Sequence, residues 1–244
     1  MRIVATIQAR MGSSRLPGKI LEDANGAPML QRMVERVRRS KHIQDVMVAT
    51  TTRPEDDKTE AACQAMGVSF YRGSSEDVLA RVVEAAQSAK ADLIVQLTGD
   101  CPVIDPQLMD MVIQYYLDHS FDYVCNFLKR TLPRGTETQV YSLKLLEGVE
   151  RSTQELAHRE HVSLYIYEHP EKYKLGNVEA EPSLSRPDLR LTLDTPEDLA
   201  LLQAIYKRLY PQKPDFGLAD VISFLDKNPE IKFLNAEITQ KPVR

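Results

Sequence analysis

The stretch RIVATIQARMGSSRLPGK, residues 2–19, joins two different kinds of sequence. Residues 2–8 are apolar and β-branched, which is typical of a buried strand. The loop that follows carries Arg10, Arg15 and Lys19 among glycines and serines, and no acidic residue appears before Glu22. In open α/β sheets, ligands bind at the carboxyl ends of strands. The stretch therefore predicts an α/β protein with an anion-binding loop after its first strand.

Strands and helices alternate in the sequence that follows this loop. Apolar periodicity predicts strands at 45–51, 68–71 and 92–97, and helices at 28–39, 54–66, 75–88 and 106–116. Such alternation indicates right-handed βαβ units and a mostly parallel sheet. Beyond residue 120 the pattern is looser, and it predicts strands at 122–125, 138–141 and 189–193, an extended piece at 172–178, and helices at 154–168, 196–210 and from 218 to just before 228. Because the sequence has no repeat and no linker, we expect a single domain over 1–244.

The composition of the chain indicates which kind of ligand it binds and in which compartment it works. The chain has 244 residues, a net charge of −4 and a pI near 5.8, which argues against a nucleic acid polymer as the ligand. No apolar run approaches the roughly 20 residues that cross a bilayer, and the run 3–7 is too short for a signal peptide. Three widely spaced cysteines (Cys63, Cys101, Cys125) suit a cytoplasmic protein with reduced thiols. A compact basic loop on an acidic protein favours a small anion, with phosphate first.

The basic loop does not match the common phosphate-binding motifs. Walker A has four residues between its glycines, whereas five separate Gly12 from Gly18, and Ile20 follows Lys19. The dinucleotide fingerprint GxGxxG is also absent. Small residues at 12–14 would instead let backbone N–H groups converge on an anion, with two arginines and one lysine around it. The alternative is a solvated basic loop with no ligand.

Two later aspartates are not needed by the helices that follow them. In LTGDCPVID, residues 97–105, Asp105 precedes Pro106 and suits the N-cap, which leaves Asp100 unassigned. In LTLDTPEDL, residues 191–199, Thr195 and the residues after it form an N-cap and capping box, which leaves Asp194 unassigned. Mg²⁺ takes one or two protein carboxylates together with phosphate oxygens and water. Asp100 and Asp194 are therefore candidate Mg²⁺ ligands, unless each only bonds its own turn.

Taken together, QARMGSSRLPGK, LTGDCP and LDTPEDL resemble the cytidylyltransferases that activate sugar acids with CTP. These include CMP-Kdo synthetase, CMP-acylneuraminate synthetase and the spore coat polysaccharide cytidylyltransferases, and the likeness covers most of the chain in the same order. It implies a single three-layer α/β/α domain of the nucleotide-diphospho-sugar transferase (GT-A-like) fold, usually dimeric. About residues 1–120 would then bind the nucleotide, and 121–244 the acceptor and the second subunit.

The resemblance also implies roles for individual residues. It assigns Asp100 and Asp194 to Mg²⁺ and adds Arg10 and Lys19 to the catalytic group. The segment RGSSEDVLAR, residues 72–81, resembles the loop that binds base and ribose, although it also reads as a helix N-terminus capped by Ser74 or Ser75. The full set implied to bind the nucleotide is Gln8, Ala9, Arg10, Met11, Gly12, Ser14, Arg15, Lys19, Ser74, Asp77, Arg81 and Thr98.

Two further stretches resemble the acceptor side of the family. LPRGTETQVY, residues 132–141, departs from relatives that carry an Asp and a Glu where this chain has Glu137 and Gln139. HREH, residues 158–161, resembles a helical motif of the same enzymes, and without HExxH it is a poor metal site. The implied acceptor residues are Arg134, Glu137, Gln139, Arg159 and His161.

The resemblance implies transfer of CMP from CTP to a hydroxyl of a small acidic sugar, with release of pyrophosphate and with Mg²⁺ as cofactor. No Ser–His or Cys–His nucleophile pair is recognisable, which suits chemistry without a covalent enzyme intermediate. Three alternatives remain open: a GT-A-like glycosyltransferase that consumes a nucleotide sugar, a non-catalytic nucleotide-binding module, and nucleotidyl transfer with another base or with a non-sugar acceptor such as a phosphonate.

Overall fold

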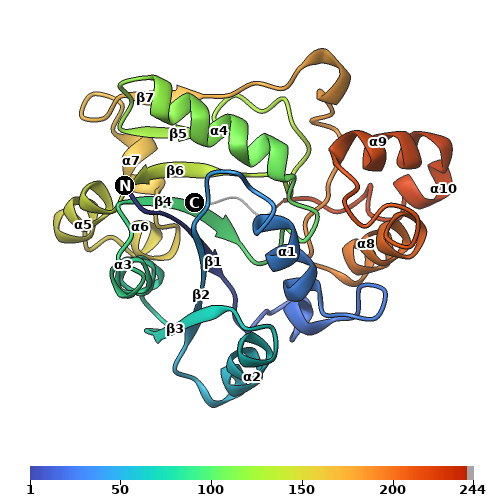
Figure 1. Cartoon of the computed structure of the whole chain (residues 1–244), viewed down its shortest axis with the longest axis horizontal. Helices are drawn as coiled ribbons and strands as arrows, with labels where there is room; N and C mark the ends of the chain where they lie inside the picture. Colours follow the sequence, from blue (N-terminus) through green and yellow to red (C-terminus); the bar gives the residue numbers. More distant parts are fainter. Residues whose placement is uncertain (241–244) are drawn as a thin grey trace.

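A computed structural model describes residues 1–240, and the last four residues of the expected domain, 241–244, lie outside the described part. It contains one seven-stranded sheet with the strand order β3-β2-β1-β4-β6-β5-β7 (Figure 1). Within the described chain, β6 alone runs antiparallel to its neighbours, so the sheet is mostly parallel as predicted. The strands are β1 (Ile3–Gln8), β2 (Asp45–Thr51), β3 (Ser69–Gly73), β4 (Leu93–Thr98), β5 (Tyr123–Cys125), β6 (Gln139–Ser142) and β7 (Leu175–Asn177).

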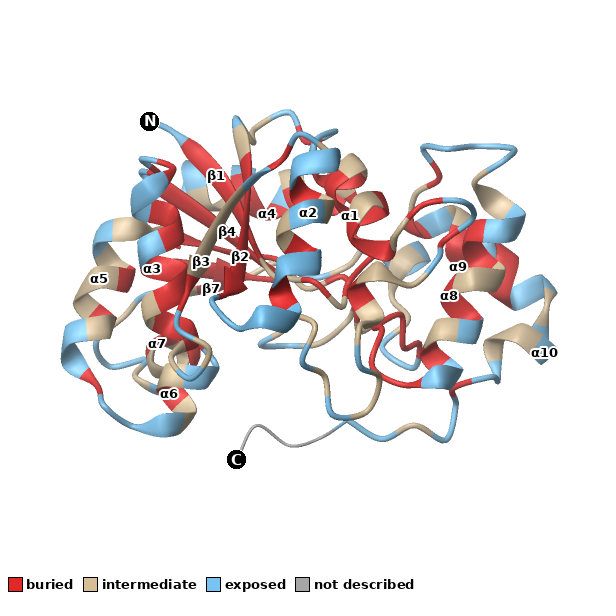
Figure 2. Ribbon diagram, turned by 90° about the horizontal axis from the view of Figure 1, so that it is seen from below, coloured by how far each residue is buried: buried red, intermediate tan, exposed pale blue. Residues whose placement is uncertain are grey.

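Helices cover both faces of this sheet, which confirms the expected three-layer α/β/α arrangement (Figures 1 and 2). One face carries α1 (Met29–Val37), α2 (Asp57–Ala65) and α4 (Pro106–Asp118). The other carries α3 (Val78–Ser88), α5 (Leu143–Ser152), α6 (Leu156–Glu160) and α7 (Leu164–Glu168). Beyond one end of the sheet lie α8 (Pro196–Leu209), α9 (Leu218–Lys227) and α10 (Pro229–Lys232). Short 3₁₀ turns occur at η1 (Lys19–Leu21), η2 (Pro54–Asp56) and η3 (Pro182–Leu184).

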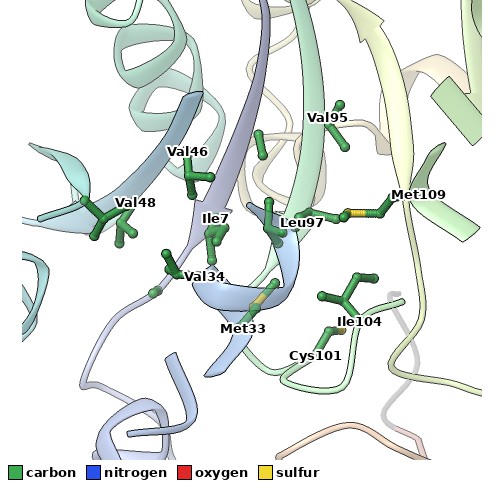
Figure 3. Close-up of a cluster of buried hydrophobic side chains, with 14 of the residues drawn as sticks. Ile7, Met33, Val34, Val46, Val48, Val95, Leu97, Cys101, Ile104 and Met109 are labelled. Atoms are coloured by element: carbon green, nitrogen blue, oxygen red, sulfur yellow. The ribbon is translucent and has the colours of Figure 1, made fainter. Parts of the chain in front are cut away.

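The alternation of side chains along the strands divides the core between the two faces. Ile3, Ala5 and Ile7 of β1 pack toward α1 and α4, whereas Val4 packs toward α3. Figure 3 shows Ile7 and Leu97 from neighbouring strands beside Met33 and Val34 of α1. A third cluster gathers α8 and α9 around leucines of the segment 189–193. No helix of the described residues is both long and apolar enough to span a membrane.

Strand register brings the ends of three strands together. β1 lies between β2 and β4, and Gln8 is opposite both Ala49 and Thr98. The loops that follow β1 and β4 are therefore neighbours. Gly99 donates its N–H to the carbonyl oxygen of Gln8 at 2.8 Å, and a Cβ at Gly99 would lie 2.8 Å from that same oxygen. The close approach of β1 therefore excludes a side chain at Gly99, whether or not a ligand binds nearby.

The second half of the chain differs from the sequence prediction in several places. The helix expected at 154–168 is two short helices, α6 and α7, because buried Val162 between them has a φ of 46° that a helix cannot contain. Helix α3 begins at Val78 and is capped by Asp77, so neither Ser74 nor Ser75 is its N-cap. Helices α5 and α10 were not predicted.

The strand expected at 189–193 is also wrong. This segment forms one isolated bridge, between Arg134 and Arg190, and its other backbone bonds are single contacts such as Leu193 N–H to the Asp100 carbonyl at 2.8 Å. Its apolar–polar alternation nevertheless has structural meaning. Leu189, Leu191 and Leu193 are buried against α8 and α9, which leaves the residues between them for the opposite side.

Candidate active site

A cavity of about 420 Å³ lies at the carboxyl ends of β1 and β4. It gathers most of the side chains that the sequence singled out, although they come from distant parts of the chain. Its lining includes Gln8, Ala9, Arg10, Gly12, Ser14, Arg15, Lys19, Arg81, Thr98, Asp100, His161 and Asp194. A larger groove of about 1010 Å³ between α4 and α9 contains none of the predicted residues. The smaller cavity is therefore the candidate site.

The basic loop is folded back on itself at the mouth of this cavity. Met11 donates its N–H to buried Asp56 at 2.6 Å, and its carbonyl oxygen accepts the N–H groups of Ser13 and Gly18, each at 2.9 Å. Gly18 has a φ of 75°, which a larger residue adopts only with strain. Met11 itself packs against the core and does not line the cavity.

Several backbone donors of this loop remain available. Within the described residues, no hydrogen bond occupies the N–H of Gly12, Ser14 or Arg15, and all three residues line the cavity. Successive free N–H groups in a turn form a concavity that suits an oxyanion. The loop therefore has the features of the anion-binding nest that its small residues predict.

Asp100 and Asp194 approach each other around Lys19. The Lys19 Nζ lies 2.8 Å from Asp194 Oδ1 and 3.8 Å from Asp100 Oδ2. Arg15 Nη2 lies 3.1 Å from Asp194 Oδ2. The two carboxylates, 94 positions apart in the chain, thus meet at one ammonium group, and the prediction that they share a site has the geometry it needs.

The surroundings of Asp194 keep it ionised. Burial raises the pKa of Asp194, but Lys19, Arg15 and Arg190 lower it by more, so the pKa of this carboxyl is held below its ordinary value. Asp100 is more open, with 26% of its side chain exposed. One Asp100 oxygen accepts a hydrogen bond from the Thr98 hydroxyl at 2.5 Å, and the other is the oxygen near Lys19.

This donor set fits a magnesium ion that is bound mainly through its substrate. Among the described residues there is no group of three or more acidic, histidine or cysteine side chains that could enclose a metal. Asp100 and Asp194 supply two carboxylates, and Mg²⁺ usually takes only one or two from a protein when phosphate oxygens complete its shell. Lys19 lies between these carboxylates, so a metal would have to replace its ammonium there.

Two guanidinium groups form the opposite wall. Arg10 Nη2 lies 3.5 Å from Glu160, and Arg10 Nη1 donates to the Ser75 carbonyl at 3.4 Å. Arg81 is buried and donates to the Ser74 carbonyl, and its Nε has no partner in the described residues. Burial and then the charge of Arg10 lower the pKa of Arg81. An anion would relieve the repulsion between these two arginines.

Ser74 and Asp77 of the segment 72–81 do not line the cavity but support a residue that does. Asp77 caps α3 through the N–H of Ala80 and pairs with Arg159, while the Ser74 hydroxyl accepts the N–H groups of the two residues that follow Ser75. Neither Ser74 nor Asp77 lines the cavity. They order the turn that leads into α3, the helix that carries Arg81.

The predicted acceptor residues are dispersed. Of the five, His161 alone lines the cavity. The Gln139 amide oxygen accepts from Tyr123 and Ser163, Arg159 is paired with Asp77, and neither residue lines the main cavity. The Glu137 carboxylate accepts hydrogen bonds from the Gly135 N–H at 2.6 Å and from the Arg130 guanidinium at 2.7 Å. Arg134 lines an adjoining cavity of about 300 Å³.

Three residues of the site were missed from the sequence. Glu160 and Gln240 line the main cavity, and Arg190 donates to Asp194 Oδ2 at 2.7 Å. Arg190 had a local signal, because it alternates with the buried leucines of 189–193 and so shares a side with Asp194. Gln240 had none, since only the fold brings the end of the chain back to this point.

Comparison with known proteins identifies the family of this chain. A sequence model of the cytidylyltransferase family matches residues 4–216. The chain belongs to the cytidylyltransferase family. As the resemblance implied, it is a CTP-dependent nucleotidyltransferase.

Individual relatives agree with this membership. The spore coat polysaccharide biosynthesis protein SpsF of Bacillus subtilis is 37% identical over 93% of this chain and 95% of its own length. A solved cytidylyltransferase from Leptospira borgpetersenii superposes with a TM-score of 0.90 at 35% identity, covering 99% of this chain and 100% of the other. A CMP:2-keto-3-deoxy-manno-octonic acid synthetase, solved with CTP, shares the fold with a TM-score of 0.66 at 22% identity over 85% and 99% of the two chains.

Proposed function

We propose that this cytidylyltransferase transfers CMP from CTP to a hydroxyl group of an acidic sugar and releases pyrophosphate in a Mg²⁺-dependent reaction. The observation that carries the proposal is the convergence of Lys19, Asp100 and Asp194 in one cavity beside the basic loop. The spore coat polysaccharide relative supports a sugar acceptor, because it spans nearly the whole chain.

The cations of the cavity bind the triphosphate. Arg10, Arg15 and Lys19 contact its oxygens together with the free N–H groups of the loop, and they stabilise the charge that develops on the leaving pyrophosphate. Nucleotidyl transfer requires positioning and charge neutralisation more than a covalent nucleophile. Arg81 completes this cationic wall, and Ser74 and Asp77 order the loop expected to bind base and ribose. Gln8, Ala9 and Thr98 shape the floor at the strand ends, and Met11 anchors the loop above it through Asp56.

Asp100 and Asp194 would hold the Mg²⁺. When bound, the ion would neutralise charge on the phosphate oxygens and would favour deprotonation of the attacking hydroxyl. The more exposed Asp100, which lines the cavity, also accepts the proton of the attacking hydroxyl, because its Oδ2 is 3.8 Å from Lys19 and has no hydrogen bond within the described residues. The acceptor binds toward residues of the second half, with His161 and the open side near Arg134 as its contacts.

The assembly and compartment are also part of the proposal. We expect a homodimer in the cytoplasm, with about residues 1–120 supplying most nucleotide contacts and the remainder the acceptor and dimer contacts. Light scattering on the purified protein tests the dimer: a monomer at micromolar concentration would contradict it.

The decisive experiment is a pyrophosphate-release screen that crosses four nucleoside triphosphates with a panel of acidic sugars in the presence of Mg²⁺. We expect release with CTP and one acceptor class. Asp100→Asn should lower turnover by at least about 100-fold while the protein stays folded. Asp118→Asn, an exposed aspartate on α4, is the matched control and should retain full activity. Near-complete release by the Asp100 variant would remove this residue from the mechanism, and release with no pair would refute the function.

A further inference from the structure

The end of the chain returns to the candidate active site. After α10, the Asn235 side chain donates to the Arg190 carbonyl at 3.0 Å and to Asp198 Oδ1 at 2.7 Å. Five residues later, Gln240 Oε1 accepts a hydrogen bond from Arg190 Nη1 at 2.6 Å. Asn235 is only 4% exposed although it lies in an irregular segment. The segment 233–240 is therefore fixed to Arg190 at two points.

Arg190 carries this connection into the site. Its Nε lies 3.0 Å from Asp198 Oδ1, and its Nη2 donates to Asp194 Oδ2 at 2.7 Å. Its side chain is 7% exposed, and that of Asp198 is fully buried. Asp198 also accepts the backbone N–H of Asp194 at 2.9 Å, so the backbone and the side chain of Asp194 are held from the same direction.

This arrangement determines how Asp194 presents its carboxylate. Arg190 and Arg15 take Oδ2, and Lys19 takes Oδ1. Of these cations, Arg190 lies outside the basic loop, and its side chain is 7% exposed, compared with 13% for Lys19 and 28% for Arg15. Gln240 accepts from the guanidinium nitrogen that faces away from Asp194, and it lines both the main cavity and the adjoining one.

We propose that Asn235 and Gln240 are positioning residues of the active site: they hold Arg190, and through it they fix the orientation of Asp194. The inference rests on the proposed function, in which Asp194 binds the metal. The sequence model of the family matches only up to residue 216, so these residues lie outside the part that defines family membership. Groups that support a metal ligand typically change metal affinity or activity by about 10–100-fold when removed.

The test centres on Gln240, because it lies in an irregular terminal segment and its replacement should leave the fold intact. Gln240→Ala and Gln240→Met remove the acceptor, and methionine keeps the side-chain volume. Gln240→Glu keeps an oxygen acceptor for Arg190. Gln212→Ala is the matched control, since the side chain of this exposed glutamine bonds only the carbonyl of Arg208 among residues 1–240. Each variant is compared for melting temperature, kcat, KM for CTP, and Mn²⁺ affinity measured by calorimetry with CTP present.

We expect the alanine and methionine variants to lose about 10-fold in kcat and in Mn²⁺ affinity. Their KM for CTP should stay within about 3-fold of the wild type, because the basic loop is intact, and Gln240→Glu should restore most of kcat. Wild-type kcat and Mn²⁺ affinity in Gln240→Ala would overturn the inference. So would a defect that Gln240→Glu does not relieve, or one that follows the melting temperature of each variant.

Failure of the two proposals can be told apart. If wild-type protein releases no pyrophosphate with any acceptor, the proposed function fails, but the Mn²⁺ measurement still compares Gln240→Ala with Gln212→Ala. Equal Mn²⁺ affinity in those two variants overturns the positioning role whatever the reaction is.

Discussion

Lys19 occupies the place between Asp100 and Asp194 that a metal ion would take. Each cation of the basic loop likewise has an acidic partner already: Arg10 has Glu160, and Arg15 has Asp194. A metal alone must displace cations, and a triphosphate alone must compete with carboxylates. Because each ligand releases the groups that the other needs, we infer that metal and nucleotide favour each other's binding.

Replacing Lys19 by methionine should change the two affinities in opposite directions. Mn²⁺ alone should bind more tightly, since two carboxylates lose the ammonium that compensates them, whereas CTP should bind more weakly by about 10-fold. Calorimetric titration with each ligand separately measures both. Lys129→Met is the control, because this lysine is 71% exposed and pairs with Glu179 on the surface. A weaker affinity for Mn²⁺ alone in Lys19→Met would contradict the interpretation.

Asp194 also links stability to pH. Although burial opposes it, the three neighbouring cations lower its pKa below the ordinary value of 3.8. A carboxyl whose pKa is lower in the folded state stabilises the protein above its unfolded pKa, and this contribution is lost as pH falls through the folded value. Asp194→Asn should therefore be less stable than wild type at neutral pH, and the difference should shrink below about pH 4. Urea unfolding at pH 7 and pH 3 measures it, and a constant difference would exclude the linkage.

Single site residues could be predicted from the sequence where the local structure left a polar residue without a role. Asp100 and Asp194 stood out because Asp105 and Thr195 already cap the following helices, and the structure has both caps. The link between Arg190 and Gln240 was missed because their contact spans 50 positions, and no local rule connects them. The burial of the Gln139 amide was not predicted for the same reason, since its partner Ser163 is known only from the fold.

Among the elements, the crossing of the segments around 135 and 191 carries the tightest backbone contact near the site. Gly135 has a φ of 95°, and a Cβ there would lie 2.5 Å from the Leu191 carbonyl carbon and oxygen. The segment at 191 continues to Asp194, so this crossing helps to place the carboxylate. The segment around residue 191 cannot move aside easily, because Leu191 is fully buried.

Gly135→Ala should lower the free energy of unfolding by about 3 kcal/mol or more, from the positive φ and the overlap together. Gly148→Ala is the matched control. It lies inside α5 with no atom within 4 Å of an added Cβ, so alanine there should stabilise by about 0.5–1 kcal/mol through helix propensity. Denaturant unfolding of both variants measures the two signs. A Gly135→Ala protein as stable as wild type would show that the crossing is more adaptable than the structure indicates.

Element prediction succeeded where caps and periodicity agreed. Helices α4 and α8 begin at the predicted prolines, and β2 has the predicted bounds, since each has a local start signal and a buried face. The helix predicted at 154–168 was wrong because the backbone reverses at Val162, a β-branched residue that gives no sequence warning of a positive φ. Tertiary burial of Val162 outweighs its local preference.

For the whole molecule, the first half was predictable because each βα unit places its strand beside one already formed. Strands β1 to β4 are parallel as predicted, although their order β3-β2-β1-β4, with β4 beside β1, was not part of the prediction. The second half was not predictable, because β6 inserts antiparallel between β4 and β5, and α8 and α9 pack on the 189–193 segment rather than on the sheet. The site draws on both halves, so its basic loop was foreseeable and its support from the chain end was not.

The reactivity of the three cysteines can be used to measure how the folded domain opens. All are buried, and none forms a disulfide. Burial raises the pKa of Cys63 to about 12, and burial likewise raises those of Cys101 and Cys125. Because the thiolate is the reactive form, the folded protein should react slowly with Ellman's reagent at neutral pH, and unfolding in denaturant should release all three thiols.

The three sites should nevertheless differ in their response to ligand. All three belong to the buried hydrophobic clusters, but Cys101 follows Asp100 in the loop of the candidate site, whereas Cys63 lies in α2 and Cys125 in β5. Local opening of the site loop costs less than global unfolding, so Cys101 should be alkylated first, and CTP with Mg²⁺ should slow it more than the other two. Mass spectrometry of peptides after timed alkylation resolves the three rates. Equal protection of all three would mean that the site loop opens only when the whole domain unfolds, and protection of none would place the nucleotide away from Asp100.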